Sequence, residues 1–546
     1  MIDFSRYGLI PFGPAPNDRH MEWYRRGRTA FLHFTVNTFT DREWGDGTES
    51  PASFAPTALD CRQWAQVLKE AGFTAAILTA KHHDGFCLWH TDTTGHCVRN
   101  SPCGVDVVRE FTDACREFGL KAGLYLSPWD RNHPAWGREE YNDVYAAQLR
   151  ELMTRYGPIW ECWWDGAGST EAHYDWARWA NIVRNCQPQC VIFGCLGAAE
   201  FVDVRWVGTE EGRAGADCWA TIDPETIVVE NCADLNSGKW GGTHFIPAET
   251  NTSIRPGWFW HESQNGQVRS PENLVKYWFE SAGRNSTILL NLPPDLRGLL
   301  HEQDVASVLR WNDALSEMFQ TDLAPLGTID ADAPIHPDCG PENLLSEDED
   351  RFYAAESLTP TITLTFPEAV TFDCWRLEEV IELGHRVRSF ALDVREQGAW
   401  RTIARGQCMG FCRCERTARV TADAIRLRIL DSGSSPVLRR IRLYDTRGIG
   451  LEHPRTQISG ELAVTLSRED GAVIADLGGI YPYDTVHFCA KGPVTIHTFN
   501  GTRYELLWTG TDSPARFAPV TGSYRLKLTG EVEMDSVQVV RSNRDI

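Results

Sequence analysis

The sequence predicts an α/β protein: a (β/α)₈ barrel followed by β-sandwich modules. From residue 20 to about 325, short apolar segments alternate with longer segments of helical period, as in parallel strands buried on both faces and joined by helices. After residue 335 the apolar period changes to two, which is typical of half-buried antiparallel strands. A chain of 546 residues is also too long for one hydrophobic core.

Eight apolar segments are candidate barrel strands, and amphipathic helices lie between them. The strands are Thr29–Thr35, Ala75–Ala80, Lys121–Ser127, Pro158–Asp165, Cys190–Cys195, Val204–Glu210, His244–Glu249 and Thr287–Leu292. The helices are Cys61–Ala71, Val105–Phe118, Tyr141–Tyr156, Tyr174–Asn185 and Pro271–Ala282. Eight strand–helix repeats in about 300 residues favour a closed barrel. An open doubly wound sheet is the alternative, but no GxGxxG motif or P-loop follows the first strand.

Prolines and glycines near residue 335 indicate a linker between the barrel and the strand-rich remainder. We therefore predict a barrel domain at residues 1–335, a β-sandwich at 336–447 and a small β-rich domain at 448–546. Asn500-Gly501 is a candidate hairpin turn in the last of these.

The charge of the chain bears on its partners. With 53 Lys and Arg against 75 Asp and Glu, the net charge is −22, which disfavours nucleic acid and anionic membranes as partners. It fits a neutral small-molecule substrate, and the 21 Trp residues favour a carbohydrate, although large cores also use Trp. No apolar segment has the length of a membrane span or the character of a signal peptide. We expect a cytoplasmic protein, or a secreted one if a leader preceded the chain.

The 17 Cys residues have no framework spacing and are expected to be reduced thiols. Cys408, Cys412 and Cys414 were weighed as zinc ligands, but no His or second Cys pair completes the set. We expect no metal in the active site and no required cofactor.

Polar and aromatic residues concentrate where the predicted strands end, which is the rim that carries the active site of such barrels. Asp165 and Glu210 each end an apolar segment, and a carboxylate there is costly to desolvate without a purpose. Two carboxylates beside an aromatic pocket suit glycoside hydrolysis, in which one attacks the anomeric carbon and the other protonates the leaving oxygen. The structural alternatives are a helix N-cap for Asp165 and a salt bridge for Glu210.

Two other chemistries are conceivable for the residues at this rim. His82, His83 and Asp84 could hold a metal ion, but neighbouring residues at a strand end point in different directions, so sugar-hydroxyl binding is favoured. A serine nucleophile is disfavoured because the sequence has no GxSxG elbow.

Seven segments of the barrel, in order, resemble glycoside hydrolase family twenty-nine, the retaining α-L-fucosidases. They are His33–Thr40 with Glu43–Gly45, Lys81–Phe86, Leu124–Pro134, Trp164–Ala167, Arg205–Gly208, Ser253–Trp258 and Gly283–Pro294. The resemblance covers roughly residues 20–320. Asn37–Thr40 and Ser127–Pro134 are similar to the subgroup selective for α-1,3/1,4-linked fucose of Lewis-type branches.

The resemblance implies a fucosylated oligosaccharide as substrate, Asp165 as nucleophile and Glu210 as acid/base. It implies a fucose pocket made of His33, Glu43, Trp44, His82, His83 and Tyr125. We further expect the substrate-binding site to include Asp130, Trp163, Glu249, Arg255 and Trp258. A retaining mechanism requires an ionised nucleophile, so we expect hydrogen-bond donors that hold the pKa of Asp165 low.

The sequence departs from the family at the acid/base. Thr209-Glu210-Glu211 stands where the family often has Asn-Glu-Arg, so Glu211 is a local rival. Strand alternation would let only one of the two face the pocket, and motif spacing selects Glu210. A fucosidase of broad linkage preference and an inactive fucose-binding lectin remain the alternatives, and the sequence leaves the oligomeric state open.

The predicted sandwich resembles a discoidin-type (coagulation factor type C) module. The residues that carry this resemblance are Gly384–Val387, Trp400–Ala404 and Leu443-Tyr444. Such modules often bind galactose-type sugars, and some hold a structural calcium ion, so a carbohydrate-binding role and a calcium site are expectations here. A module that only braces the barrel is the alternative.

Overall fold

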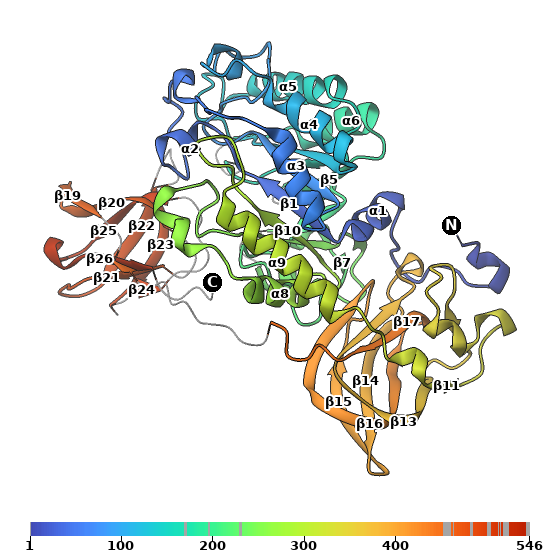
Figure 1. Ribbon diagram of the computed structural model, residues 1–546. Helices are drawn as coiled ribbons and strands as arrows, with labels where there is room; N and C mark the ends of the chain where they lie inside the picture. The colour runs from blue at the N-terminus through green and yellow to red at the C-terminus, as the bar shows by residue number, and fades with distance from the viewer. Residues whose placement is uncertain are drawn as a thin grey trace.

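The computed structural model consists of a closed eight-stranded parallel barrel and three antiparallel β-sheets C-terminal to it (Figure 1). It describes residues 2–168, 172–194, 197–228 and 232–450. In the C-terminal part it describes 460–461, 464–480, 484–499, 504–511, 513, 515–516 and 523–541. The predicted fold class, a barrel followed by sandwich-like β-modules, is confirmed.

The barrel strands pair in the closed order β1-β2-β3-β4-β5-β6-β9-β10. Their bounds are Arg28–Leu32 (β1), Ala75–Lys81 (β2), Lys121–Leu126 (β3), Glu161–Trp163 (β4), Val191–Gly194 (β5), Val204–Trp206 (β6), Ala248–Ser253 (β9) and Thr287–Asn291 (β10). The helices are Asp18–Arg26 (α1), Val36–Thr40 (α2), Cys61–Glu70 (α3), Val107–Phe118 (α4), Tyr141–Arg155 (α5), Trp176–Cys186 (α6), Cys232–Ser237 (α7), Pro271–Glu280 (α8) and Glu302–Met318 (α9).

The seventh barrel strand differs from the prediction. The segment His244–Glu249 was expected to end at the active-site rim, but His244–Phe245 forms a separate strand, β8, that pairs with β7 (Thr221–Ile222). The barrel strand is β9, in which Glu249 is the second residue and Ser253 the last. The predicted position of this strand was wrong because the prediction relied on apolar segments. Strand β9 is polar, with the sequence Ala-Glu-Thr-Asn-Thr-Ser, and yet it is fully buried.

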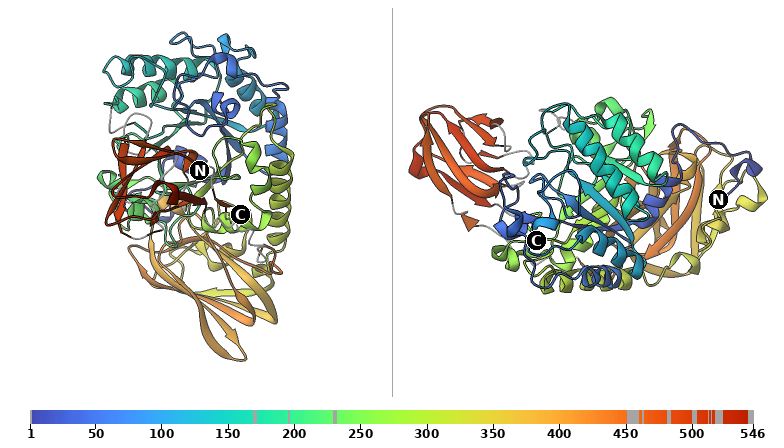
Figure 2. Two further views of the ribbon diagram at one scale, coloured as in Figure 1. Left: turned by 90° about the vertical axis from the view of Figure 1, so that its left-hand side faces the viewer. Right: turned by 90° about the horizontal axis from the view of Figure 1, so that it is seen from above.

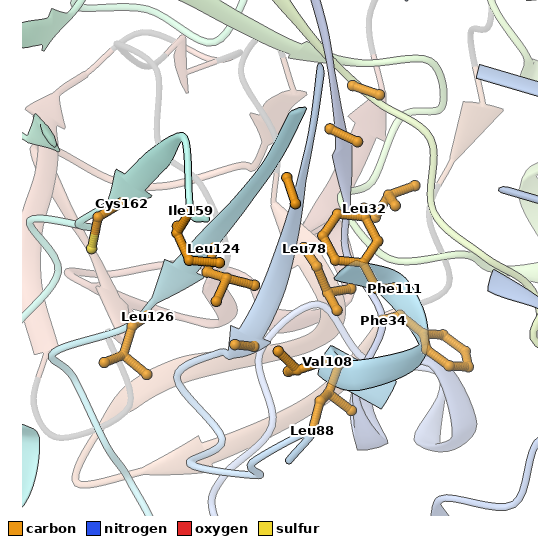
Figure 3. Close-up of a cluster of buried hydrophobic side chains, with 14 of the residues drawn as sticks. Leu32, Phe34, Leu78, Leu88, Val108, Phe111, Leu124, Leu126, Ile159 and Cys162 are labelled. Carbon is orange, nitrogen blue, oxygen red and sulfur yellow. The ribbon is translucent and has the colours of Figure 1, made fainter. Parts of the chain in front are cut away.

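The outer face of the barrel packs against the helices, as the predicted periodicity requires. In Figure 3, Leu78 of β2 and Leu124 of β3 face the α4 side chains Val108 and Phe111, all of them buried. Alternate residues of a strand share a face, so the residues between these outward-facing ones are directed into the barrel. Those inward positions carry the residues of the candidate active site.

The sandwich is built around two long strands that bend at β-bulges. Its strands are β11 (Thr328–Ala331), β12 (Tyr353–Ala354), β13 (Thr361–Glu379), β14 (Val387–Glu396), β15 (Ala399–Gly406), β16 (Arg413–Ser432) and β17 (Val437–Tyr444). The first half of β13 pairs with β11 and β16, and its second half pairs with β16 and β17. The register shifts between Thr365 and Val370 let one strand serve both halves of the sheet.

Two segments within residues 1–335, which the sequence assigns to the barrel domain, contact the sandwich module. The first sandwich strand, β11, starts at Thr328, before the predicted border at 335, because it pairs with β13. At the other end of the chain, the rings of Phe4 and Tyr7 pack on Phe352 of the sandwich module. Contacts between distant segments therefore decide to which domain a segment belongs. The proline and glycine pattern of a linker does not show such contacts.

The C-terminal domain contains two further antiparallel sheets with a core of their own. One joins β18 (Gly460–Glu461), β26 (Gln538–Arg541), β21 (Asp484–His487) and β24 (Ala515–Arg516). The other joins β19 (Thr465–Glu469), β20 (Ala472–Ile480), β25 (Ser523–Thr529), β22 (Val494–Phe499) and β23 (Tyr504–Gly510). The predicted turn Asn500-Gly501 lies outside the described residues, although β22 and β23 on either side of it pair antiparallel.

The two β-rich parts lie on opposite sides of the barrel in Figure 1 and in the right-hand view of Figure 2. No helix in the described part of the chain is long and apolar enough to cross a membrane.

Candidate active site

Asp165 is the second residue after β4 and points into a site formed by the neighbouring strands. Its Oδ2 accepts a 3.0 Å hydrogen bond from the Tyr125 hydroxyl, and its Oδ1 accepts a 2.7 Å bond from the Ala167 N–H. Its side chain remains 28% exposed. The N-cap alternative is excluded, because the next described helix, α6, is capped by Asp175.

The pKa of Asp165 differs from the sequence-based expectation. Burial raises it above its usual value, and the donors from Ala167, Tyr125 and Gly166 only oppose that rise. The carboxylate is thus destabilised by desolvation and restored in part by hydrogen bonds. Such a group is more readily protonated in mild acid than an exposed aspartate.

Two histidines present the same ring nitrogen to the pocket. His33 Nδ1 donates to Asn291 Oδ1 at 2.8 Å, and the Asn291 amide is oriented by its own donation to Trp258 O. His83 Nδ1 lies 2.7 Å from Ser127 Oγ, whose hydroxyl proton is donated to Trp129 O, so His83 is the donor. With each Nδ1 protonated, each Nε2 of a neutral ring is an acceptor.

Burial keeps these rings neutral. It lowers the pKa of His33 to about 4 and the pKa values of His82 and His83 well below their usual range. His82 stacks on Tyr125 with ring centroids 5.8 Å apart. Neutral imidazoles suit the binding of uncharged hydroxyl groups. Among the described residues, no group of three His, Cys, Asp or Glu side chains is arranged to hold a metal ion.

Glu210 and Glu211 have different partners. Trp258 Nε1 donates to Glu210 Oε2 at 3.3 Å, whereas Glu211 forms an ion pair with Arg213. Strand β6 ends at Trp206, so both glutamates belong to the loop after it, and the expected strand alternation does not choose between them. The hydrogen bond to Trp258 connects Glu210 to a ring that packs against His33.

A continuous set of rings joins the two carboxylates. The Trp258 ring lies 5.1 Å from the ring of His33, which lies 6.1 Å from the ring of Tyr125. Because Trp258 binds Glu210 and Tyr125 binds Asp165, both carboxylates border one pocket. Trp44, which is partly exposed, meets the ring of His83 edge-on at 5.4 Å.

Three predicted pocket residues have their polar groups taken up by protein partners. Asp130 is buried in an ion pair with Lys81, at 3.1 Å, and Arg255 is buried against Asp304 at 2.8 Å. Glu249 accepts 3.0 Å hydrogen bonds from the indoles of Trp23 and Trp163.

Trp163 itself forms part of the floor of the site. It stacks on Phe193 at 4.0 Å and lies 5.2 Å from Tyr125.

Sequence reasoning missed four residues that shape the site. Asn291 and Ser127 fix the histidine tautomers, Phe259 packs on His82 at 5.0 Å, and His261 binds Glu43. The rule that places sites at strand ends could have found Asn291, the last residue of β10. No comparable pattern marks His261, which lies in a loop.

Two carboxylates, neutral histidine acceptors and several indole rings at the mouth of a (β/α)₈ barrel define the class of the site as that of a glycoside hydrolase. The comparisons with known proteins agree. A sequence model described as alpha-L-fucosidase matches residues 7–313. Alpha-L-fucosidase 1 of Arabidopsis thaliana is 36% identical over 467 residues, which cover 82% of this chain and 91% of the plant protein.

Solved structures support the same family. A candidate α-L-fucosidase from Bacteroides thetaiotaomicron is 44% identical with a TM-score of 0.78, covering 80% of this chain and 99% of its own. A glycoside hydrolase 29 family member from a rumen bacterium is 31% identical with a TM-score of 0.72, covering 96% of this chain and 97% of its own. The chain belongs to the α-L-fucosidase family of glycoside hydrolases.

Proposed function

We propose that this protein is a retaining exo-α-L-fucosidase that releases α-1,3/1,4-linked fucose from Lewis-type oligosaccharides. The observation that carries the catalytic part is the ring set from Trp258 to Tyr125, which brings Glu210 and Asp165 to one pocket. A Ruminococcus gnavus family 29 fucosidase, 27% identical with a TM-score of 0.72, has been solved in complex with fucose. The linkage preference rests on the motifs at residues 37–40 and 127–134.

In the first step, Asp165 attacks the anomeric carbon of fucose while Glu210 transfers its proton to the glycosidic oxygen. The C–O bond breaks and the aglycone leaves as an alcohol, so fucose is held as an ester of Asp165. In the second step, the Glu210 carboxylate takes a proton from water, and the water oxygen attacks the same carbon. Asp165 leaves as a carboxylate, and the two inversions together retain the α configuration.

The pocket suits a deoxy sugar with three free hydroxyl groups. The Nε2 atoms of neutral His33 and His83 accept hydrogen bonds from hydroxyls, and Trp44 adds an indole at the partly exposed edge. The faces of Tyr125, Trp163 and Trp258 offer apolar surface to C–H groups and to the fucose methyl group.

The stereochemical outcome tests the mechanism. Early ¹H NMR spectra during hydrolysis should show α-fucose first, with β-fucose appearing later by mutarotation. If β-fucose forms first, the enzyme inverts and the nucleophile role of Asp165 is wrong.

The linkage is tested by fucose release from Lewis-a and Lewis-x trisaccharides and from 2′-fucosyllactose. Rapid release from the Lewis sugars alone supports the branched-linkage proposal. Release from all three supports the fucosidase but contradicts the linkage preference. Release from none, with fucose still bound in calorimetry, favours the lectin alternative.

A further inference from the structure

His261 connects two loops at the barrel mouth. Its Nδ1 lies 2.6 Å from Asp41 Oδ1, at the C-terminus of α2, and its Nε2 lies 2.6 Å from Glu43 Oε1. His261 itself belongs to the loop that follows β9, and both its ring and the Glu43 side chain are buried, with 8% and 1% exposed. The imidazole thus joins the β1 loop to the β9 loop.

Both bonds require donation from the ring. Ionised carboxylates only accept hydrogen bonds, so both nitrogens of His261 carry protons and the ring is an imidazolium. The paired carboxylates agree with this: they raise the pKa of His261 to about 9 although burial opposes the rise. The charged groups shown facing this ring are Asp41 and Glu43.

Glu43 passes the connection on to the backbone beside the active site. Its Oε2 accepts from the Trp258 N–H at 2.8 Å, and its Oε1 accepts from the Phe259 N–H at 3.2 Å. The side chain of the same Trp258 donates to Glu210. The path therefore runs from His261 through Glu43 and the Trp258 backbone to the carboxylate proposed as acid/base.

We propose that His261 is a positioning residue: through Glu43 it fixes the Trp258 loop so that the Trp258 indole holds Glu210 in place for proton transfer. This inference rests on the proposed function of Glu210. It also gives Glu43 a role besides contact with sugar, because the protein already supplies both of its oxygens with donors.

The two bonds of His261 differ in importance. The Asp41 side chain is 78% exposed, so its charge is screened by solvent and its hydrogen bond competes with water. The Glu43 carboxylate is buried, and losing its charged donor leaves it with two backbone N–H groups only. The Glu43 bond should therefore carry the positioning effect.

Two substitutions separate these bonds. In His261→Gln the amide reaches the position of Nε2 and keeps a donor to Glu43, whereas in His261→Asn it reaches the position of Nδ1 and keeps only the bond to Asp41. His244→Asn is the matched control, because His244 is exposed on β8 and bonds only to its neighbour Thr243 among the contacts shown. Circular dichroism and thermal melting check that each variant is folded.

Two substrates separate positioning of the acid from general damage. Lewis-a trisaccharide needs protonation of its leaving oxygen, whereas α-L-fucosyl fluoride loses fluoride with little help from an acid. We expect His261→Asn to lower kcat/KM for the trisaccharide about 100-fold, which is the effect of displacing a catalytic group by about 1 Å. For the fluoride, the same variant should lower kcat/KM less than about 5-fold. His261→Gln should lie between this variant and wild type.

The outcomes distinguish this inference from the proposed function. If folded His261→Asn loses both activities equally, or if His261→Gln is as damaged as His261→Asn, the positioning role is wrong. If the trisaccharide activity of His261→Asn is unchanged, the connection to Glu210 is also wrong. If wild type cleaves neither substrate, the proposed function fails before His261 is tested.

Discussion

The Tyr125 hydroxyl donates a 3.0 Å hydrogen bond to Asp165 Oδ2, across the neighbouring strands β3 and β4. The two strands pair in register, Tyr125 opposite Trp163, which places the phenol beside the first residues after β4. The bond stabilises the charged form of Asp165 in a site where burial favours the neutral form. The geometry of two strands thus sets the protonation of the proposed nucleophile.

Replacing Tyr125 by Phe should move the acid limb of the pH–rate profile. Loss of this donor raises the pKa of Asp165 further, so the reactive carboxylate is lost at a higher pH than in wild type. We expect the acid midpoint of kcat/KM to rise by about 1 pH unit, the order expected for one lost hydrogen bond. Profiles from about pH 4 to pH 7 measure this.

Tyr145→Phe is the control for Tyr125→Phe. It also removes a buried phenol hydroxyl, one that donates to Leu126 O and not to Asp165. An acid limb that shifts equally in both variants, or in neither, would contradict the proposed effect on Asp165.

Glu210→Ala should separate the two catalytic steps. For Lewis-a trisaccharide we expect kcat/KM to fall about 10²–10⁴-fold, the usual contribution of a general acid. For α-L-fucosyl fluoride kcat/KM should change little, because the leaving group needs no proton. Added azide should restore turnover of the fluoride by attacking the ester of Asp165. NMR should identify α-fucosyl azide as the product.

Glu211→Ala is the matched control, since it removes the neighbouring carboxylate and its ion pair with Arg213. It should change kcat/KM less than about 3-fold, as expected for a partly exposed pair. If azide instead restores Glu211→Ala, the two roles must be exchanged.

Trp258→Phe should reproduce part of the Glu210 effect. The variant keeps an aromatic ring near His33 but loses the indole N–H that binds Glu210. We expect kcat/KM for the trisaccharide to fall about 10-fold, which corresponds to the loss of about one hydrogen bond, and the fluoride reaction to fall less. Trp240→Phe, which removes an indole beside Trp219, is the control. Equal losses on both substrates would mean that Trp258 binds sugar and does not position the acid.

Much of the barrel could be predicted from the sequence because seven of its eight strands are short apolar segments next to amphipathic helices. The remaining strand, β9, could not be predicted, because its buried side chains are polar. They form hydrogen bonds with residues outside the strand, as Thr252 does with Tyr277. Its buried position depends on hydrogen bonds between distant segments, and hydropathy does not record them.

The residues of the candidate site could be predicted only where the barrel architecture itself places them. Residues at strand ends, such as Asp165 and His83, follow from the barrel architecture. Asp130 was also placed at the rim, but its charge is taken up by Lys81, a partner that only the folded structure reveals. His261 lies in an irregular loop, where no periodicity applies, and its importance comes from contacts with residues about 220 positions away.

Glu161 and Glu249 form a buried acid pair below the site. Burial and mutual repulsion raise the pKa of Glu161 well above its usual value, and burial raises that of Glu249 to about 7. Neither Glu161 oxygen has a hydrogen-bond partner, so burial favours the protonated, neutral form of this carboxyl. Glu249 accepts from the indoles of Trp23 and Trp163.

Glu161→Gln should make the protein more stable above neutral pH. A raised pKa contributes stability below about 4.5, the usual value, and this is lost as pH rises through the folded value, about 7 for Glu249. The introduced amide carries no charge at any pH, so the variant should gain about 1–3 kcal/mol at about pH 8 and little at about pH 5. Thermal and urea unfolding at both pH values, with exposed Glu110→Gln as control, measure this. A variant destabilised equally at both pH values would show that ionisation of Glu161 does not limit the stability of the protein.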